Sequence, residues 1–178
     1  TSFKFASNYG WWSSSKGEYN PAMITDRVVS GDFNGDGLCD IAAFYEYGAT
    51  STRIHVFESK GTAFTYKGNN GWWNATSYAP SKITNRIVSG DFDGDGKCDI
   101  AAFYDYGNNT TRLHVWKSSN TYFTFQGKYG WWGSTTFSAS QISGKIAAGD
   151  FNADGKPDIS MFYDYGNNTT GNFVLKST

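Results

Sequence analysis

The architecture of this chain follows from one stretch, Asp91-Phe92-Asp93-Gly94-Asp95-Gly96-Lys97-Cys98-Asp99. Its acidic side chains stand at positions 1, 3, 5 and 9 of a nine-residue loop, and glycines stand at positions 4 and 6. Similar loops begin at Asp32 and at Asp150, so both steps along the chain are 59 residues. An acidic loop that recurs at a fixed period indicates a repeat protein, in which each repeat forms one structural unit.

Composition limits the classes of protein to which the chain can belong. Its 178 residues suffice for one domain with a substantial core, and its net charge of −1 gives no electrostatic case for binding nucleic acid. Its apolar runs are only a few residues long, too short to span a bilayer. Aromatic residues make up 19% of the chain and glycine contributes 21 residues, which together with Ser and Thr indicates an all-β protein.

Each repeat contains four short segments with the pattern of strands. In the middle repeat, residues 86–90 enter the acidic loop and residues 100–104 leave it. After a turn rich in Gly and Asn, residues 112–116 alternate with period two. An aromatic segment at 123–125 then leads to the sequence Gly-Trp-Trp at 130–132. No stretch has a convincing helical period, so each repeat is predicted to be four antiparallel strands.

The predicted fold is therefore all-β, a β-propeller of four-stranded antiparallel blades with three blades per chain. Residues 1–178 are taken as a single repeat domain, with blades at about 13–73, 74–132 and 133–178. An N-terminal strand at 1–12 precedes the first blade, because Phe3 to Trp12 has the pattern of a fourth strand.

Three blades do not close a ring, and an open array would leave exposed sheet edges. We expect oligomerisation to close it, as a homodimer of six blades in which Phe3 to Trp12 of each chain completes the last blade of the other. Two alternatives stay open, namely that the chain is a piece of a longer array, or that it is a β-trefoil. Cys39 and Cys98 are expected to be free thiols, because equivalent positions in neighbouring repeats usually lie too far apart for a disulfide. A bridge between them stays open as the alternative.

The acidic loops are predicted to hold Ca²⁺ in a structural role, since calcium prefers six to eight oxygen ligands. Carboxylates or amides at positions 1, 3, 5 and 9, with the backbone carbonyl of position 7, supply such a set. The alternative is an acidic turn without an ion. The middle loop carries the most charge and should bind most tightly, and loops of this kind favour a secreted, extracellular protein. The predicted ligands are Asp32, Asn34, Asp36, Leu38, Asp40, Asp91, Asp93, Asp95, Lys97, Asp99, Asp150, Asn152, Asp154, Lys156 and Asp158.

The sequence Asp-Phe-Asn-Gly-Asp-Gly followed by Asp-Ile-Ala, at 32–37 and 40–42, resembles the FG-GAP/VCBS repeats. Such repeats occur in integrin α-subunit propellers, in propeller lectins and in modules of secreted bacterial proteins. The resemblance covers the whole chain, three times over. It implies a β-propeller and favours carbohydrate binding. Known members usually have seven blades, and three repeats do not divide into seven.

Glycans are the predicted partners, bound by aromatic and polar residues that recur between the loops. Apolar sugar faces stack on exposed rings, and arginines bond to hydroxyls. The alternative for the tryptophans is that both members of each pair fill space between blades. The arginines and histidines could instead lie on a solvated strand face. The predicted sugar-binding residues are Trp12, Trp73, Trp132, Tyr47, Tyr106, Tyr165, Arg53, His55, Arg112 and His114.

The leading functional hypothesis is a calcium-stabilised, multivalent carbohydrate-binding protein, either a lectin or a carbohydrate-binding module. The rival is a protein-interaction or adhesion scaffold of the integrin-like type. A glycoside hydrolase or other secreted enzyme is the weakest reading, because no G-x-S-x-G or H-E-x-x-H motif occurs and both histidines are repeat-equivalent. We therefore expect no catalytic residues.

Overall fold

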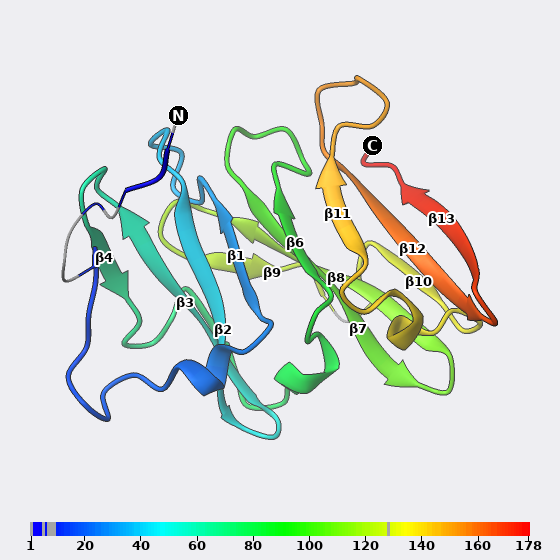
Figure 1. Ribbon diagram of the computed structural model, residues 1–178, viewed down its shortest axis with the longest axis horizontal. Helices are drawn as coiled ribbons and strands as arrows, with labels where there is room; N and C mark the ends of the chain where they lie inside the picture. The colour runs from blue at the N-terminus through cyan, green and yellow to red at the C-terminus, as the bar shows by residue number, and fades with distance from the viewer. Residues whose placement is uncertain (1, 5, 7–9, 128) are drawn as a thin grey trace.

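A computed structural model describes residues 2–4, 6, 10–127 and 129–178. These residues form three antiparallel sheets, which follow one another in sequence order across the molecule (Figure 1). Sheet 1 consists of β1 (Val28–Gly31), β2 (Asp40–Gly48), β3 (Ser51–Ser59), β4 (Phe64–Lys67) and β5 (Trp73–Ala75). Sheet 2 consists of β6 (Ile87–Gly90), β7 (Asp99–Gly107), β8 (Thr110–Ser118), β9 (Phe123–Phe125) and β10 (Trp132–Ser134). Sheet 3 consists of β11 (Ile146–Gly149), β12 (Asp158–Gly166) and β13 (Thr169–Leu175).

The prediction of an all-β protein is confirmed. The helical segments of the described residues are three short 3₁₀ turns: η1 (Pro21–Ile24), η2 (Pro80–Lys82) and η3 (Ala139–Ile142). None of the described helices is long and apolar enough to cross a membrane. The three sheets repeat one plan, since β1, β6 and β11 pair with β2, β7 and β12 in the same register. All three acidic loops consequently emerge at the same edge of the array (Figure 1).

The core lies between successive sheets. Between sheets 1 and 2, the ring of Phe44 packs edge-on against Trp116, with 4.9 Å between their centroids, and both side chains are fully buried. Between sheets 2 and 3, Phe103 and Val115 belong to a second buried cluster that also contains Met161. Sheet 2 therefore buries apolar side chains on both of its faces, as the inner unit of stacked repeats does.

The expected fourth strand is present in sheets 1 and 2, but in two pieces. Both β4 and β5 pair with β3, and both β9 and β10 pair with β8. The break falls before the Gly-Trp-Trp sequence, where Gly71 and Gly130 have φ of +67° and +64°. A glycine is required there, because a Cβ on Gly130 would lie 2.2 Å from the carbonyl oxygen of Leu113.

Two features differ from the predicted blades. Sheet 3 has three strands among the described residues, with β13 at its edge, so the three sheets form an open array and not a closed ring. The predicted N-terminal strand falls partly on residues 1, 5 and 7–9, which lie outside the described residues, and its described residues are not in a strand. A strand needs a neighbouring edge for its backbone hydrogen bonds, and residues 2–4 have no such pairing in the single chain. Cys39 and Cys98 are free thiols.

Candidate metal loops and aromatic surface

The middle acidic loop is folded around the side chain of Asp91. Its two carboxylate oxygens accept hydrogen bonds from the backbone N–H groups of Asp95 and Gly96, both at 2.9 Å. Gly94 and Gly96 have φ of +77° and +86°, which lets the chain wrap so closely. The other two loops repeat this arrangement, since Asp32 and Asp150 each accept from the glycine at position 6, at 2.8 and 2.9 Å.

The same loop brings three carboxylates together. Asp91, Asp93 and Asp99 each place an oxygen within 4.8 Å of the others. Asp99 is fully buried. One of its oxygens accepts a 2.9 Å hydrogen bond from the N–H of Ser118, and the other has no hydrogen-bond partner among the described residues. Burial, reinforced by Asp93 and Asp95, raises the pKa of Asp99 to about 7.

This donor set fits a hard divalent cation. The orphaned oxygen of Asp99 lacks the positive partner that a buried carboxylate requires. Lysines supply part of the compensating charge, since Lys97 lies 2.9 Å from Asp95 and Lys117 forms an ion pair with Asp93. A bound cation would compete with Lys117 for Asp93.

The outer loops have the same backbone but a different acid set. Asn34 and Asn152 stand at position 3, and their side chains donate to Asp36 and Asp154 at 3.1 and 2.8 Å. Among the described residues, only those of the middle loop bring three carboxylate groups within ligand distance. The buried Asp158 of the third loop also keeps one oxygen without a partner in the part of the chain that the structure describes.

An aromatic surface lies at the far ends of the long hairpins from the acidic loops. It contains one exposed tyrosine per sheet, Tyr47, Tyr106 and Tyr165, whose side chains are 49%, 47% and 58% exposed. The guanidinium of Arg53 lies over the ring of Tyr47, 4.4 Å from its centroid, and donates to the carbonyl of Asn69 at 2.7 Å.

The equivalent arginine of sheet 2 points elsewhere. Arg112 lies over the backbone of Gly133, where a Cβ would be 2.6 Å from its side chain, and its guanidinium is 5.9 Å from the ring of Tyr129. The position of Gly133 is occupied by Asn74 one repeat earlier, and a side chain there would block this path. Sheet 3 has Gly171 in place of the arginine, so its tyrosine has no such cation.

The two histidines predicted to contact sugar are buried. His55 and His114 are 1% and 2% exposed, so a glycan in solvent would not reach them. The Nε2 atom of His55 forms a hydrogen bond with the hydroxyl of Tyr47, and that of His114 forms one with the hydroxyl of Tyr106, both at 3.2 Å. Burial lowers the pKa of both histidines to about 4, with a smaller contribution from the neighbouring arginine. The histidines are therefore neutral, and they position the tyrosine hydroxyls through these hydrogen bonds.

The predicted tryptophans are half-buried. Trp73 contacts the rings of Tyr78, Trp116 and Phe125, with 5.3, 5.4 and 5.7 Å between centroids. Trp12 and Trp132 occupy the same place in the other repeats, with centroids 5.3 Å from Tyr19 and from Phe137. These contacts favour the alternative in which the second tryptophan of each pair fills space between sheets.

Sequence reasoning missed a set of basic residues. Arg27 is buried and donates to the carbonyl of Met23 at 2.8 Å and to Glu46 at 3.2 Å. In sheet 3, Lys145 reaches Asp164 at 3.5 Å in the same way. Glu46 and Asp164, each of which stands between two tyrosines in the sequence, thus take part in ion pairs of the fold. The signal was available, because Arg27, Arg86 and Lys145 recur at the 59-residue period.

The comparison with known families agrees with this architecture. The family model described as "FG-GAP-like repeat" matches residues 32–102 and 91–160. These overlapping matches together cover more than half of the chain, each beginning at an acidic loop, so the chain belongs to the FG-GAP-like repeat family. No curated protein gives a significant match.

Proposed function

We propose that this protein is a calcium-stabilised, multivalent carbohydrate-binding protein, a lectin or carbohydrate-binding module that acts outside the cell. The observation that carries the proposal is the recurrence of an exposed tyrosine at the same place in all three sheets. Equivalent weak sites on one rigid array gain strength through simultaneous binding.

The sugar sites are proposed at the exposed tyrosines, with Arg53 beside Tyr47 in sheet 1 and with Arg112, which lies toward Tyr129, in sheet 2. A flat ring offers contact area to the apolar face of a sugar at a low entropy cost. The guanidinium of Arg53 would donate to sugar hydroxyls beside the Tyr47 ring. The site in sheet 3 would depend on Tyr165 alone and should be the weakest.

Calcium is proposed as a structural ion held by the acidic loops, the middle loop first. It would neutralise the carboxylates of Asp91, Asp93 and Asp99 and fix the hairpin between β6 and β7. The 4.8 Å grouping of their oxygens and the unpartnered oxygen of Asp99 support this role. The loops lie at the opposite ends of the long strands from the exposed tyrosines, so the ion would act on stability and not on the sugar directly.

Glycan binding is tested by substituting the repeated tyrosines. The triple variant Tyr47→Ala, Tyr106→Ala and Tyr165→Ala should lose binding on a broad glycan array, whereas Tyr122→Ala should keep it. Tyr122 is a matched control, since its side chain is 53% exposed and lies outside the repeated set. Competition by simple sugars should abolish the wild-type signal. An array without any signal would contradict the proposal.

The second candidate is a protein-interaction or adhesion scaffold. Exposed tyrosines and arginines also dominate the binding energy of protein interfaces. Recovery of a protein partner whose binding the triple tyrosine variant abolishes, together with a silent glycan array, would favour it. An enzymatic role has the weakest support, because the titratable groups of the aromatic surface recur in successive repeats or pair with one another.

The proposed partners also include a second copy of the chain. The homodimer with exchanged N-terminal strands would present six tyrosine sites on one ring.

A further inference from the structure

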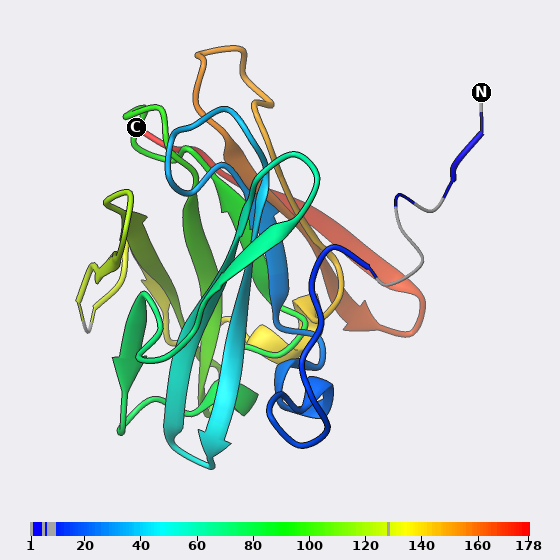
Figure 2. The same ribbon diagram turned by 90° about the vertical axis from the view of Figure 1, so that its left-hand side faces the viewer.

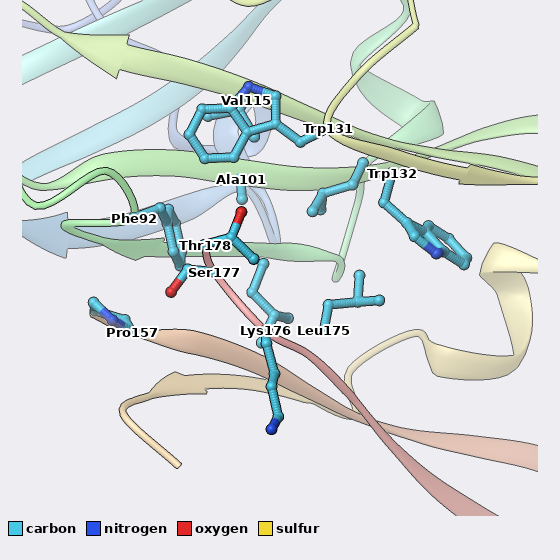
Figure 3. Close-up of a pocket in the computed structure, with 12 residues that line it drawn as sticks. Phe92, Ala101, Val115, Trp131, Trp132, Pro157, Leu175, Lys176, Ser177 and Thr178 are labelled. Carbon is cyan, nitrogen blue, oxygen red and sulfur yellow. The ribbon is translucent and has the colours of Figure 1, made fainter. Parts of the chain in front are cut away.

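The outer edge of sheet 3 borders an open cleft of about 410 Å³. Trp131 and Phe92 of the second repeat lie on one side of it, and Leu175 to Thr178 lie on the other (Figure 3). Trp131 is 45% exposed, whereas its counterpart Trp72 is 6% exposed. The difference arises because Trp72 is covered by the fourth strand of sheet 2.

The covering strand shows how this cleft would be filled. The N–H of Phe123 donates to the carbonyl of Trp72 at 2.8 Å, and its ring lies 5.4 Å from Trp72 and 5.5 Å from Phe33. The first repeat has the same bond, from the N–H of Phe64 to the carbonyl of Trp11 at 3.0 Å. A third phenylalanine in this register would contact Trp131 and Phe92, the repeat equivalents of Trp72 and Phe33.

The outward face of sheet 3 is a second uncovered surface. Phe151, Phe162 and Val174 are 54%, 53% and 41% exposed. Their counterparts one repeat earlier are buried, with Phe92 at 4%, Phe103 at 0% and Val115 at 1% exposure. Isolated apolar side chains are common on surfaces, but three that occupy core positions of the repeat indicate an interface.

Sheet 3 departs from the pattern at two positions of that face. Asn172 and Ser160 stand where sheet 1 has Ile54 and Ala42. The amide of Asn172 donates to the hydroxyl of Ser160 at 2.9 Å. The pair satisfies part of its own hydrogen bonding, so it adds little to the cost of covering the face.

The complementary surface is at the other end of the array. Ile142 and Ile159, which cover sheet 2, are 0% and 4% exposed. Their counterparts in the first repeat, Ile24 and Ile41, are only half-buried. Phe3 is fully exposed, at the position equivalent to Phe64 and Phe123. Figure 2 shows that residues 2–4 lie away from the sheets.

We propose that the cleft beside β13 receives Phe3, Trp11 and Trp12 of a second copy of this chain, whose first sheet then covers Phe162 and Val174. The N–H of the partner's Phe3 donates to the carbonyl of Trp131, and its ring packs between Trp131 and Phe92. Each copy supplies one donor end and one receiving end, so two copies close a ring of six sheets through two identical junctions. A head-to-tail contact of this type forms a ring only when its rotation closes.

The acidic loops supply a second contact between the two copies. Cys98, at position 8 of its loop, packs on Gly31, where a Cβ would lie 2.7 Å from the Cβ of Cys98. Pro157 packs on Gly90 in the same way, at 3.0 Å. The next glycine in the series is Gly149, where an added Cβ would meet only the ring of Phe151 within 4 Å. The partner's Cys39, which is exposed in the single chain, belongs over Gly149.

The first test is the size of the particle in solution, measured by light scattering during gel filtration at micromolar concentration. The wild-type chain should have twice its mass of 19.7 kDa. Phe162→Glu should be a folded monomer, because this side chain is already half exposed in the single chain, and Tyr122→Glu, with the same 53% exposure, should remain a dimer. A wild-type monomer, a trimer, or a Phe162→Glu dimer would each overturn the proposal.

The second test is a cross-link that only this register permits. Gly149→Cys should form a disulfide-linked dimer with the partner's Cys39 on mild oxidation. Equivalent intrachain positions place the two Cβ atoms 2.7 to 3.0 Å apart, and a displacement of the loop by about 1 Å gives the separation that a disulfide needs. The control Thr121→Cys adds an exposed thiol away from the junction, and Cys39→Ser in the Gly149→Cys background should abolish the link. Equal cross-linking of Gly149→Cys and Thr121→Cys would overturn the register.

The inference deepens the proposed function, since it doubles the number of tyrosine sites, but it can fail independently. A monomer that still binds glycans would overturn the dimer and leave the carbohydrate sites in place. If a further repeat of a longer chain is the natural occupant of the cleft, the 178-residue chain will be monomeric and the proposal falls.

Discussion

Asp99 is the buried carboxylate of the middle acidic loop. Its carboxylate is fully buried, one oxygen is unpartnered among the described residues, and its pKa is raised to about 7. A group in this position is costly to ionise alone and is stabilised by a cation. Burial also disfavours the charged form of His55 and His114, but for a histidine this lowers the pKa, so both stay neutral.

Asp99→Asn should weaken calcium binding at the middle loop by about tenfold or more, since ligand charge sets affinity in such loops. In chelator, the variant should be at least as stable as the wild type, because it removes a buried charge and keeps the oxygen that accepts from Ser118. Calorimetric titration and urea unfolding give the two values. Asp105→Asn is the control, because Asp105 lies near the end of β7, outside the acidic loop. Unchanged calcium affinity in Asp99→Asn would refute the ligand role.

Acid should destabilise the protein through His55 and His114. Their pKa values are about 4 in the folded chain, against 6.5 for the unperturbed side chain. The unfolded chain therefore binds protons first, and stability is lost as the pH falls from about 6.5 towards 4. The loss is on the order of 3 kcal/mol per histidine. Urea unfolding at several pH values measures it.

The double variant His55→Phe and His114→Phe should flatten this part of the pH profile, since phenylalanine does not titrate. Phe173 stands at the equivalent position in sheet 3, so the repeat already accommodates this side chain. An unaltered slope in the double variant would assign the acid sensitivity to other groups.

At the scale of elements, the sheets are fitted together through glycines that precede the acidic loops. Gly31 and Gly90 end β1 and β6, and each lies against the residue at position 8 of the next loop. The contact is reinforced by the N–H of Cys98, which donates to the carbonyl of Asp32 at 2.8 Å. The acidic loops therefore join neighbouring sheets as well as the strands of one hairpin.

Gly31→Ala should lower the free energy of unfolding by about 1–3 kcal/mol, the usual cost of overpacking. The added methyl group would lie 2.7 Å from the Cβ of Cys98, and a separation that short forces the sheets apart. Gly149→Ala is the matched control, because the same methyl group meets no neighbouring sheet within one chain. Thermal unfolding at a concentration low enough to keep the chain monomeric compares them. Equal stability of the two variants would show that this contact is not tight.

At the scale of the whole molecule, stability should depend on calcium. Ten of the sixteen acidic residues lie in the three loops, so removing a bound cation leaves like charges close together. Ligand at a hundredfold excess over its dissociation constant stabilises a fold by about 2.7 kcal/mol. Chelation should therefore lower the melting temperature by about 5–10 °C for a chain of this size.

Calcium added back should restore the melting temperature, and magnesium at the same concentration should restore less, because it fits large oxygen sites poorly. Differential scanning calorimetry in chelator, calcium and magnesium makes the comparison. A melting temperature that is the same in all three conditions would remove calcium from the proposed function.

The 59-residue period and the alternation within each repeat were enough to predict an all-β protein of repeated antiparallel sheets, because local patterning decides which segments become strands. The same pattern located the acidic loops, since turn geometry is set by nearby residues. The burial of individual side chains could not be predicted from the local pattern. His55 and Tyr47 are both polar aromatic residues near one hairpin, yet one is buried and the other exposed, because Tyr19, Tyr45 and Tyr66 surround the imidazole.

What the sequence determined by itself is the repeat: its strands, its turns and its acidic loops, all of which depend on contacts within about 59 residues. What only the tertiary structure decided is the environment of each copy. Trp72 and Trp131 occupy equivalent places in the sequence, but a strand from the next repeat covers the first and leaves the second 45% exposed. The physical reason is that burial is a property of neighbours, and three equivalent repeats in an open array do not have equivalent neighbours.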